Sequence, residues 1–281
     1  MYENYYGFKE LPFNVTPDPR FLYRSESHRD ALAYITYGVF QKKGFIAVTG
    51  EVGVGKTTVV NAFIDLFQPS LEVAFVFSTL FPFDQLLYLI CNDFGIDAEN
   101  MNKAQMLLAL NRFLISQYEN NRNTVLIIDE AQNLSPEVLE ELRMLSNLET
   151  RDRKLIQIML VGQPELENIL NLNELRQLRQ RIPGVCRIPM LSREDVIKYI
   201  KYRLEIASVN NGGPVFTDDA LEEIYHYSGG TPRLINVLCD RVLLLGYVAN
   251  TRTISGKIVR EGIRDLESKE SPVMDRRNGP M

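Results

Sequence analysis

The sequence has 281 residues, of which 45% are hydrophobic and 24% are charged, and its 36 acidic against 31 basic side chains give a formal net charge of −5. These proportions are typical of a folded protein of about two domains and exclude a largely disordered chain. The acidic balance also excludes nucleic-acid binding by bulk positive charge and leaves only a local basic surface for such a role.

Three features of the sequence indicate the cellular location of the protein: its cysteines, the length of its apolar runs and its first residues. No apolar run approaches the roughly 18 residues that a membrane-spanning helix needs. Residues 1–6 are acidic and aromatic, unlike the basic and then apolar start of a signal peptide. Cys91, Cys186 and Cys239 lie far apart and are interpreted as buried apolar residues. We therefore expect a cytoplasmic protein without membrane insertion, which would reach the inner membrane only through a partner.

The N-terminal part, residues 1–43, is expected to pack on a core that follows it. Pro12, Pro17 and Pro19 each fix φ and bias the preceding residue toward extended geometry, so residues 11–20 should form a stiff strap. Residues 25–42 then have the pattern of a helix.

Strands and helices alternate in residues 44–191. The predicted strands are continuous apolar runs, the pattern of a parallel sheet covered on both faces. They lie at residues 45–49, 73–77, 125–128, 156–161 and 185–188. The helices predicted between them lie at residues 57–67, 85–94, 103–119 and 136–148. This order predicts an α/β core with a doubly wound, five-stranded parallel sheet.

The chain changes character after Leu191. Helices are predicted to begin at Ser192, Thr217 and Thr231, and a fourth covers residues 255–267, whereas strand patterns are absent. We therefore expect residues 192–270 to form an all-helical lid domain. Residues 271–281 have no periodicity and are expected to be a disordered tail.

A glycine-rich segment lies between the first predicted strand and the next helix. Residues 50–57 fit the pattern G-x-x-x-x-G-K-[ST], in which glycines let backbone N–H groups point at phosphate oxygens beside a helix N-terminus. Lys56 should reach the β- and γ-phosphates of ATP, and Thr57 should offer its hydroxyl to Mg²⁺. The predicted nucleotide-binding residues here are Gly50, Glu51, Val52, Gly53, Val54, Gly55, Lys56, Thr57 and Thr58.

Two further predicted strands end in polar residues. Asp129 and Glu130 follow one of them, and carboxylates at that end face the crevice where such sheets bind ligands. Asp129 should hold Mg²⁺ through its water shell, and Glu130 should polarise the attacking water. Gln163 follows the next strand and could contact the γ-phosphate or the water, or could be an ordinary turn residue before Pro164.

Residues 175–203 are locally basic, with eight basic and two acidic side chains. The segment could be a solvated surface, could bind nucleic acid, or could supply an arginine finger to the γ-phosphate in a neighbouring subunit. Arg181, at the end of a helix, is the favoured finger, and Arg179 and Arg176 are the other candidates.

Arg233 follows the predicted helix start at Thr231 and Pro232 and so lies in the first turn. A cation there is unfavourable against the helix dipole, a cost that a nearby phosphate would remove. The plain alternative is an exposed arginine turned to solvent. His28 and His226 have no metal-binding spacing to a cysteine, so surface or packing roles are expected for them.

These motifs together resemble the AAA+ ATPases, and within them the general secretion pathway protein A (ExeA-like) family. The likeness covers about residues 1–267 and rests on blocks at residues 2–8, 12–13, 16–23, 28, 31–32, 37–38, 129–134, 141–143, 145–147, 161–166, 178–182 and 232–236. It implies that Gln163 is sensor 1, that Arg233 is sensor 2, and that subunits form a ring or arc with a finger from the next subunit. The secretion proteins continue into a membrane helix and a peptidoglycan-binding part, which this sequence does not include. Exosortase-associated ATPases are similar over the same span.

We therefore expect an AAA+ ATPase that hydrolyses Mg-ATP in a homo-oligomer and moves its lid against its core. Its output would drive or switch a protein partner in envelope secretion or in polysaccharide or protein export. The alternative is a DNA-associated AAA+ ATPase of the transposition-regulator or origin-recognition type, for which residues 175–203 would contact DNA. A nucleotide-gated scaffold with little turnover is a third interpretation, against which Glu130 argues.

Overall fold

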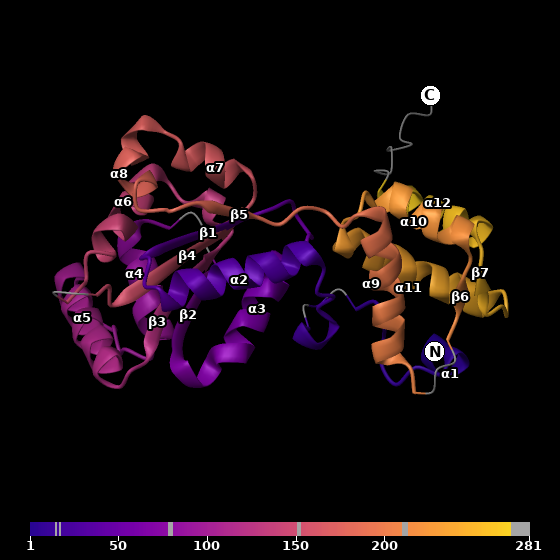
Figure 1. Ribbon diagram of the computed structural model, residues 1–281, viewed down its shortest axis with the longest axis horizontal. Helices are drawn as coiled ribbons and strands as arrows, with labels where there is room; N and C mark the ends of the chain where they lie inside the picture. The colour runs from indigo at the N-terminus through magenta and orange to yellow at the C-terminus, as the bar shows by residue number, and fades with distance from the viewer. Residues whose placement is uncertain (15, 17, 78–80, 151–152, 210–212, 271–281) are drawn as a thin grey trace, which may run out of the picture. The chain divides into compact units, whose positions relative to one another are not determined.

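The computed structural model describes residues 1–14, 16, 18–77, 81–150, 153–209 and 213–270, which form two compact units (Figure 1). One unit consists of residues 18–189 and contains the sheet. The other combines residues 1–17 with the chain from residue 190 onward. The tail expected at residues 271–281 lies outside the described residues, and so do residues 15 and 17 of the expected strap.

Five parallel strands form the sheet of the first unit, in the order β2-β3-β4-β1-β5. They are β1 (Phe45–Thr49), β2 (Leu71–Phe77), β3 (Asn123–Asp129), β4 (Ile156–Gly162) and β5 (Val185–Arg187). Each coincides with a predicted apolar run, so the predicted α/β fold with a five-stranded parallel sheet is confirmed. Because all strands run in one direction, their carboxyl ends meet at a single edge of the sheet.

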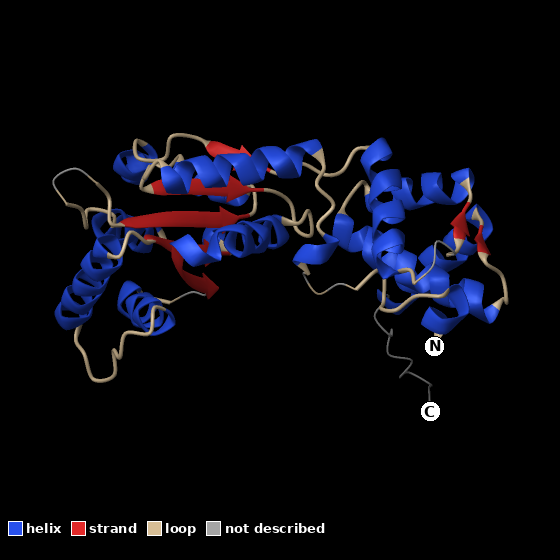
Figure 2. Ribbon diagram, turned by 60° about the horizontal axis from the view of Figure 1, so that its bottom comes forward, coloured by secondary structure: helices blue, strands red, loops and turns tan. Residues whose placement is uncertain are grey.

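Helices cover both faces of this sheet, because successive strand residues point to opposite sides (Figures 1 and 2). Ile46 and Val48 of β1 pack in one apolar cluster with α2 (Glu26–Phe40) and α3 (Lys56–Phe67). Phe45 and Ala47 pack in a second cluster with the helices of the other face. Those helices are α4 (Phe83–Asp93), α5 (Lys103–Glu119), α6 (Pro136–Leu145), α7 (Glu165–Leu170) and α8 (Arg176–Arg179).

The second unit is built mainly of helices, as predicted. They are α1 (Tyr2–Tyr6), α9 (Arg193–Ala207), α10 (Asp218–Ser228), α11 (Pro232–Val248) and α12 (Gly256–Glu270). The expected absence of strands does not hold, because β6 (Val215–Phe216) pairs in parallel with β7 (Thr253–Ile254). Two residues are too few to produce the pattern by which a strand is recognised in a sequence. None of the helices within the described ranges is both long and apolar enough to cross a bilayer.

The N-terminal segment packs differently from the expectation that all of residues 1–43 lie on the core. Residues 1–17 belong to the second unit, and only residues 18–43 stay with the sheet. The aromatic side chains of the segment are the physical reason, since they are buried among the C-terminal helices. Tyr6 is 1% exposed, and its hydroxyl donates to the carbonyl oxygen of Leu243 at 3.2 Å.

A buried arginine holds the same segment. Arg203 of α9 is buried, its Nε donates to the carbonyl oxygen of Pro12 at 2.6 Å, and its Nη2 donates to that of Asn14 at 3.1 Å. Its Nη1 donates to the Tyr199 hydroxyl at 2.7 Å. Burying a guanidinium is costly unless its N–H groups find acceptors. These backbone carbonyl groups therefore explain why residues 12 and 14 lie against α9.

Candidate active site

Segments predicted to act together meet at one edge of the sheet. The strands β3, β4 and β1 are neighbours in that order, so their carboxyl ends lie side by side. A hydrogen bond from Gly50 N to Gly162 O, 3.2 Å long, ties the segment after β1 to the end of β4. The glycine loop, the acidic pair after β3 and Gln163 after β4 are thereby brought to one place.

The glycine loop, residues 50–55, curls because two of its glycines adopt left-handed backbone angles, with φ 81° at Gly53 and φ 101° at Gly55. Val54 is buried in the apolar cluster that also contains side chains of α2 and α3. Within the described part of the chain, the backbone N–H groups of Val52, Gly53 and Gly55 donate to no other residue. The loop therefore presents unsatisfied donors directly before a helix N-terminus, an arrangement that fits the phosphates of a nucleotide.

Lys56, the first residue of α3, is buried and turned back on this loop. Its Nζ donates to the carbonyl oxygens of Gly50 at 2.8 Å and Glu51 at 3.0 Å. Burial lowers the pKa of the ammonium group, and the nearby carboxylates of Glu130 and Asp129 oppose that shift. An anion bound at the loop would therefore meet a cation as well as backbone donors.

Asp129 ends β3 as a buried carboxylate that is only 4% exposed. Its Oδ2 accepts from Thr57 Oγ1 at 3.0 Å, and its Oδ1 accepts from the Glu130 N–H at 2.9 Å. Burial raises the pKa of Asp129, and these two hydrogen bonds oppose the shift. A hydroxyl beside a carboxylate fits a hydrated Mg²⁺. The described ranges contain no group of three or more His, Cys, Asp or Glu that could hold a metal, so phosphate oxygens and water would complete its ligands.

Glu130 directs its carboxylate toward two amides. Its backbone is left-handed, with φ 52° and ψ 37°, a strained conformation for this residue type. Its Oε2 accepts from Gln132 Nε2 at 2.6 Å and from Gln163 Nε2 at 3.2 Å. The hydrogen bond from Gln132 is the main cause that lowers the pKa of Glu130. The predicted site residues Glu130 and Gln163 are therefore in contact, and Gln132 joins them without having been assigned a role from the sequence.

His28, for which a surface or packing role was expected, supports the glycine loop from α2. It is 5% exposed, its Nδ1 lies 2.6 Å from Ser25 Oγ, and its Nε2 lies 3.1 Å from the carbonyl oxygen of Val54. A carbonyl oxygen only accepts, so Nε2 carries the proton. A Cβ at Gly55 would lie 3.2 Å from the same nitrogen. The ring therefore holds the loop backbone and occupies the space that the glycine leaves, which no spacing in the sequence indicates.

The three candidate finger arginines lie at the helix α8. Arg181 is half-buried, and its Nη1 donates to Ser146 Oγ at 2.9 Å and to Asn147 Oδ1 at 2.6 Å, just past the end of α6. Arg176 and Arg179 are exposed. Arg181 therefore has the more fixed place within its own subunit.

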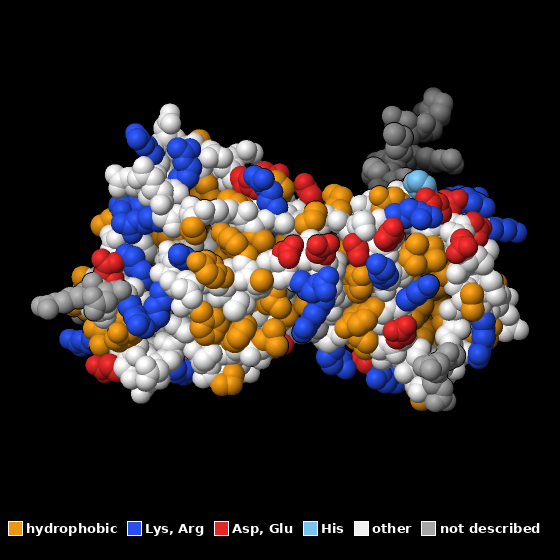
Figure 3. All heavy atoms as spheres, viewed as in Figure 1, with side chains coloured by type: hydrophobic (Ala, Val, Ile, Leu, Met, Phe, Trp, Pro, Cys, Tyr) orange, Lys and Arg blue, Asp and Glu red, His pale blue; other side chains and the backbone are white. Residues whose placement is uncertain are grey.

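Several basic residues of the segment 175–203 are engaged within the protein. Arg187 and Arg193 are ion-paired with glutamates, and Arg203 is buried. The segment also passes from one compact unit to the other after residue 189. Figure 3 shows the basic side chains of the visible face in separate groups among acidic and apolar ones. This arrangement offers no support for the DNA-binding alternative.

Arg233 lies in the first turn of α11, in the second unit. Its side chain is exposed, and it has neither a hydrogen bond nor an ion pair with any residue that the structure describes. The helix has no acidic residue in its first turn, so the unfavourable position against the helix dipole is uncompensated. A contact with nucleotide stays a prediction for this residue.

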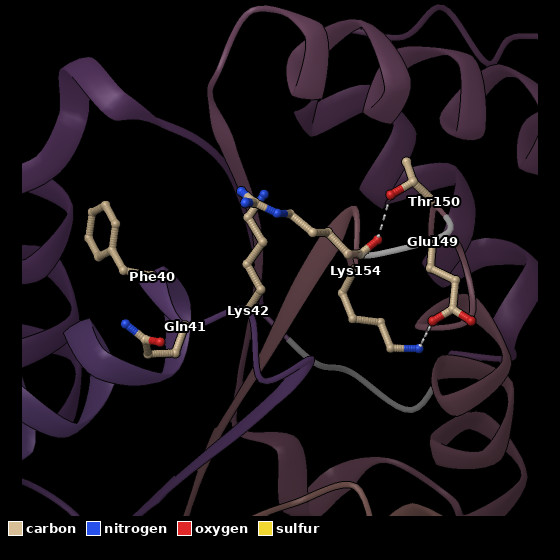
Figure 4. A pocket seen from close by; sticks show the side chains of 7 residues that line it. Phe40, Gln41, Lys42, Glu149, Thr150 and Lys154 are labelled. Atoms are coloured by element: carbon tan, nitrogen blue, oxygen red, sulfur yellow. Dashed lines mark hydrogen bonds and ion pairs between the residues drawn. The ribbon is translucent and has the colours of Figure 1, made fainter.

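A polar cavity of about 510 Å³ lies away from the glycine loop. It is lined by Phe40, Gln41, Lys42, Glu149, Thr150, Arg153 and Lys154 (Figure 4). These residues precede β1 and β4, so the cavity lies at the amino ends of the strands. Lys154 is ion-paired with Glu149, and Lys42 lies over the Tyr118 ring. None of the predicted site residues lines this cavity.

Comparison with known proteins shows what this chain is similar to. A family model described as an AAA domain matches residues 40–170. The matched range includes the glycine loop, the acidic pair and Gln163. General secretion pathway protein A of Aeromonas hydrophila is 38% identical over 281 residues, which cover 98% of this chain and 51% of that protein. The chain thus spans about half the length of this curated relative.

Solved structures share the fold over most of the chain. Cdc6p of Pyrobaculum aerophilum has a TM-score of 0.70 at 16% identity, covering 91% of this chain and 70% of that one. The ORC2 protein of Aeropyrum pernix, in ADPNP and ADP complexes, has a TM-score of 0.68 at 19% identity, covering 94% and 73%. The predicted resemblance to AAA+ ATPases of the general secretion pathway protein A type is confirmed by this similarity.

Replacing Asp129 by Asn should separate stability from metal binding. Burial raises the pKa of Asp129 in the folded protein, so binding of a proton at this carboxyl group stabilises the folded state. This contribution to the free energy of unfolding is fully present below the pKa of the unfolded chain and is lost as the pH rises through the pKa of the folded protein. Asp129→Asn should therefore raise the Tm of the nucleotide-free protein at pH 7 by about 2 °C or more, a gain that shrinks toward acidic pH. It should also remove the extra stabilisation that Mg²⁺ adds in the presence of ATP.

Thermal unfolding between pH 5 and 8, with and without ATP and Mg²⁺, measures both effects. A lower Tm for nucleotide-free Asp129→Asn at pH 7, or an undiminished Mg²⁺ effect, would contradict the prediction.

Removing the His28 ring should loosen the glycine loop and weaken the binding of ADP and of ATP to the same extent. One hydrogen bond contributes roughly 0.5–1.5 kcal/mol, so His28→Ala should raise the Kd for ADP and for ATP by about 3- to 10-fold. His28→Gln keeps an N–H donor and should recover part of the loss. Isothermal titration gives both constants, with the exposed His226→Ala as the control. Unchanged affinity in folded His28→Ala would show that the ring does not hold the loop.

Proposed function

We propose that this chain binds Mg-ATP at the glycine loop and hydrolyses it as a homo-oligomer, to drive or switch envelope secretion or export machinery. One observation carries the proposal. The loop donors with Lys56, the Thr57–Asp129 contact and the Glu130–Gln163 contact all lie at the carboxyl ends of three neighbouring strands. Anion binding, metal binding and proton removal would thus be combined at one edge of the sheet.

Each residue would have a role set by its chemistry. The N–H groups of the glycine loop and the Lys56 ammonium group would bind the phosphates, and Thr57 and Asp129 would hold Mg²⁺. Bound Mg²⁺ would supply positive charge that stabilises the phosphates during the reaction. Gln163 would act as sensor 1, near the γ-phosphate. Glu130 would accept the proton of the attacking water.

The carboxylate of Glu130 is suited to that last role. Its Oε2 already accepts from two amides, whereas its Oε1 accepts from no residue in the described ranges. The hydrogen bonds lower the pKa of Glu130, so the carboxylate stays ionised at neutral pH. An ionised acid with one oxygen uncommitted can accept a proton from a water molecule.

Assembly would bring an arginine finger from the next subunit, and Arg181 is the candidate that we favour. Its Nη1 is used within its own subunit, whereas its Nε and Nη2 donate to no residue that the structure describes. A guanidinium held at one end can offer the other with little loss of side-chain freedom. A finger that one subunit supplies to the pocket of the next would make a head-to-tail contact and would produce a ring or arc.

The second unit would act as the lid. Arg233 would serve as sensor 2, because its exposed guanidinium has no acidic partner in the described part of the chain. A nucleotide phosphate would compensate the cation in the first turn of α11. Closure of this unit on the core would then follow the state of the nucleotide.

The output of this motion is inferred from the curated relative. Its name assigns that protein to the general secretion pathway, and identity to it extends over 98% of this chain. We propose a protein partner in secretion or in polysaccharide or protein export, through which this chain would reach the inner membrane from the cytoplasm.

Two variants test the hydrolysis itself. Lys56→Ala should lose ATP binding, because it removes the cation that faces the phosphates. Glu130→Gln should bind ATP with little change and hydrolyse it at least about 100-fold more slowly, because an amide cannot accept the proton. Titration and a phosphate-release assay measure the two quantities. Normal turnover in Glu130→Gln would remove Glu130 from the reaction.

Mixing variants tests assembly and the finger. Arg181→Ala should bind ATP normally and hydrolyse it about 10³-fold more slowly. Mixed with Lys56→Ala, it should regain activity, since the intact finger of one subunit can serve the intact pocket of the other. The ATPase rate is followed across mixing ratios, with oligomer formation checked by light scattering. No recovery at any ratio in an assembled mixture would exclude Arg181, and the same assay then applies to Arg179→Ala and Arg176→Ala.

A further inference from the structure

One amide connects the acidic end of β3 to the end of β4. Gln132 lies in the short 3-10 turn at Ala131–Asn133 that follows Glu130. Its Nε2 donates to Glu130 Oε2 at 2.6 Å, and its Oε1 accepts from the backbone N–H of Gln163 at 3.0 Å. The two ends of this side chain therefore contact groups from two different strand ends.

Chemistry fixes which way the amide points. The backbone N–H of Gln163 can only donate, so the atom that faces it must be the amide oxygen. The amide nitrogen then faces Glu130, whose carboxylate can only accept when ionised. A flipped amide would lose both hydrogen bonds, so each of its neighbours requires the observed orientation.

The end of β4 has the shape that this contact needs. A Cβ at Gly162 would lie 2.8 Å from Gln132 Oε1 and 3.1 Å from Leu166 Cδ2. The φ of Gly162 is not positive, so close approach and not backbone freedom explains the glycine. The space left at position 162 is occupied by the amide of Gln132.

Gln132 and Gln163 donate to the same oxygen of Glu130. Both amides bind Oε2, which leaves Oε1 without a donor among the described residues. The Gln132 contact is the shorter of the two and is anchored at its far end to the strand backbone, whereas the Gln163 contact is made by a side chain alone. Gln132 is therefore the group that sets where Glu130 points relative to β4.

We propose that Gln132 is a positioning residue for the ATP hydrolysis proposed above: it ties Glu130 Oε2 to the backbone of Gln163 and so presents Oε1 to the attacking water. The inference rests on that function and goes beyond it, because it names the group that determines which oxygen of Glu130 takes the proton. It also couples Glu130 to the position of Gln163, so a shift at the end of β4 would move both together.

Three variants separate the two halves of the contact. Gln132→Met has a similar length and lacks both hydrogen bonds. Gln132→Glu keeps an acceptor for the Gln163 N–H but cannot donate to Glu130 and places a like charge beside it. Gly162→Ala leaves Gln132 in place and pushes a methyl group into the space of its oxygen. Asn133→Ala, which removes an exposed amide from the same turn, is the matched control.

Steady-state ATPase kinetics, binding of ADP and hydrogen exchange at the Gln163 amide are measured for each variant. Gln132→Met should lower kcat by about 10- to 100-fold, as expected for a misplaced general base. KM and the Kd for ADP should stay within about twofold. In the absence of nucleotide, the Gln163 N–H should exchange roughly fivefold faster or more, because its acceptor is gone.

The other variants should divide these effects. Gln132→Glu should lower kcat as strongly while the Gln163 N–H stays protected, and Gly162→Ala should lower kcat and protection together. Asn133→Ala should change neither. Should Gln132→Met fail to fold, as shown by thermal unfolding, Gln132→Glu and Gly162→Ala carry the test.

A folded Gln132→Met with kcat within about twofold of wild type would overturn the inference. So would an equal loss of kcat and of ADP binding, which would indicate a purely structural role. A wild-type protein that binds ATP without turnover would instead contradict the proposed function, and the role of Gln132 with it.

Discussion

The hydrogen bond from Thr57 Oγ1 to Asp129 Oδ2 joins the helix after the glycine loop to the end of β3, across 72 residues of sequence. The two groups can meet because only β4 separates β1 from β3 in the sheet. Asp129 is buried and accepts two hydrogen bonds. Burial raises its pKa because these bonds do not fully replace the hydration of the carboxylate in water. The edge of the sheet is therefore built with a carboxylate whose charge is under-compensated, a condition that a bound cation would relieve.

The same edge is organised by small groups that leave room for one another. A Cβ added at Gly50 would lie 2.7 Å from the backbone oxygen of Ile188. The missing side chain of Gly162 makes space for Gln132. Around these close approaches, hydrogen bonds connect the ends of β1, β3 and β4. Rigid strands thus hold the polar groups, while the left-handed backbone at Glu130 turns its side chain toward them.

The second unit is held together by a buried arginine and by buried aromatic side chains. Arg203 is buried among backbone carbonyl groups of residues 12 and 14, and Tyr2 and Tyr6 of α1 are buried beside α11. The chain therefore begins on the C-terminal helices and only then enters the sheet unit. The chain therefore passes between the two units twice, once after residue 17 and once after residue 189.

Most strands, helices and site motifs of this protein can be predicted from its sequence, because each depends on a local pattern of residues. Five apolar runs gave the five strands, and the capping residues Ser135 and Ser192 marked helices that the structure contains. The glycine loop and the acids after β3 are contiguous motifs, and the strand-to-helix context that surrounds them follows from periodicity. The strands β6 and β7 were missed because two residues carry no period.

Only the tertiary structure decided which single side chains support those motifs. His28 meets Val54 and Gln132 meets Gln163 across gaps of 26 and 31 residues, through one hydrogen bond each. Such a contact depends on where two elements pack and leaves no spacing to recognise. For the same reason residues 1–17 were expected on the wrong unit: prolines restrict the backbone locally, but the carbonyl groups of Pro12 and Asn14 that accept from Arg203 determine where this segment lies.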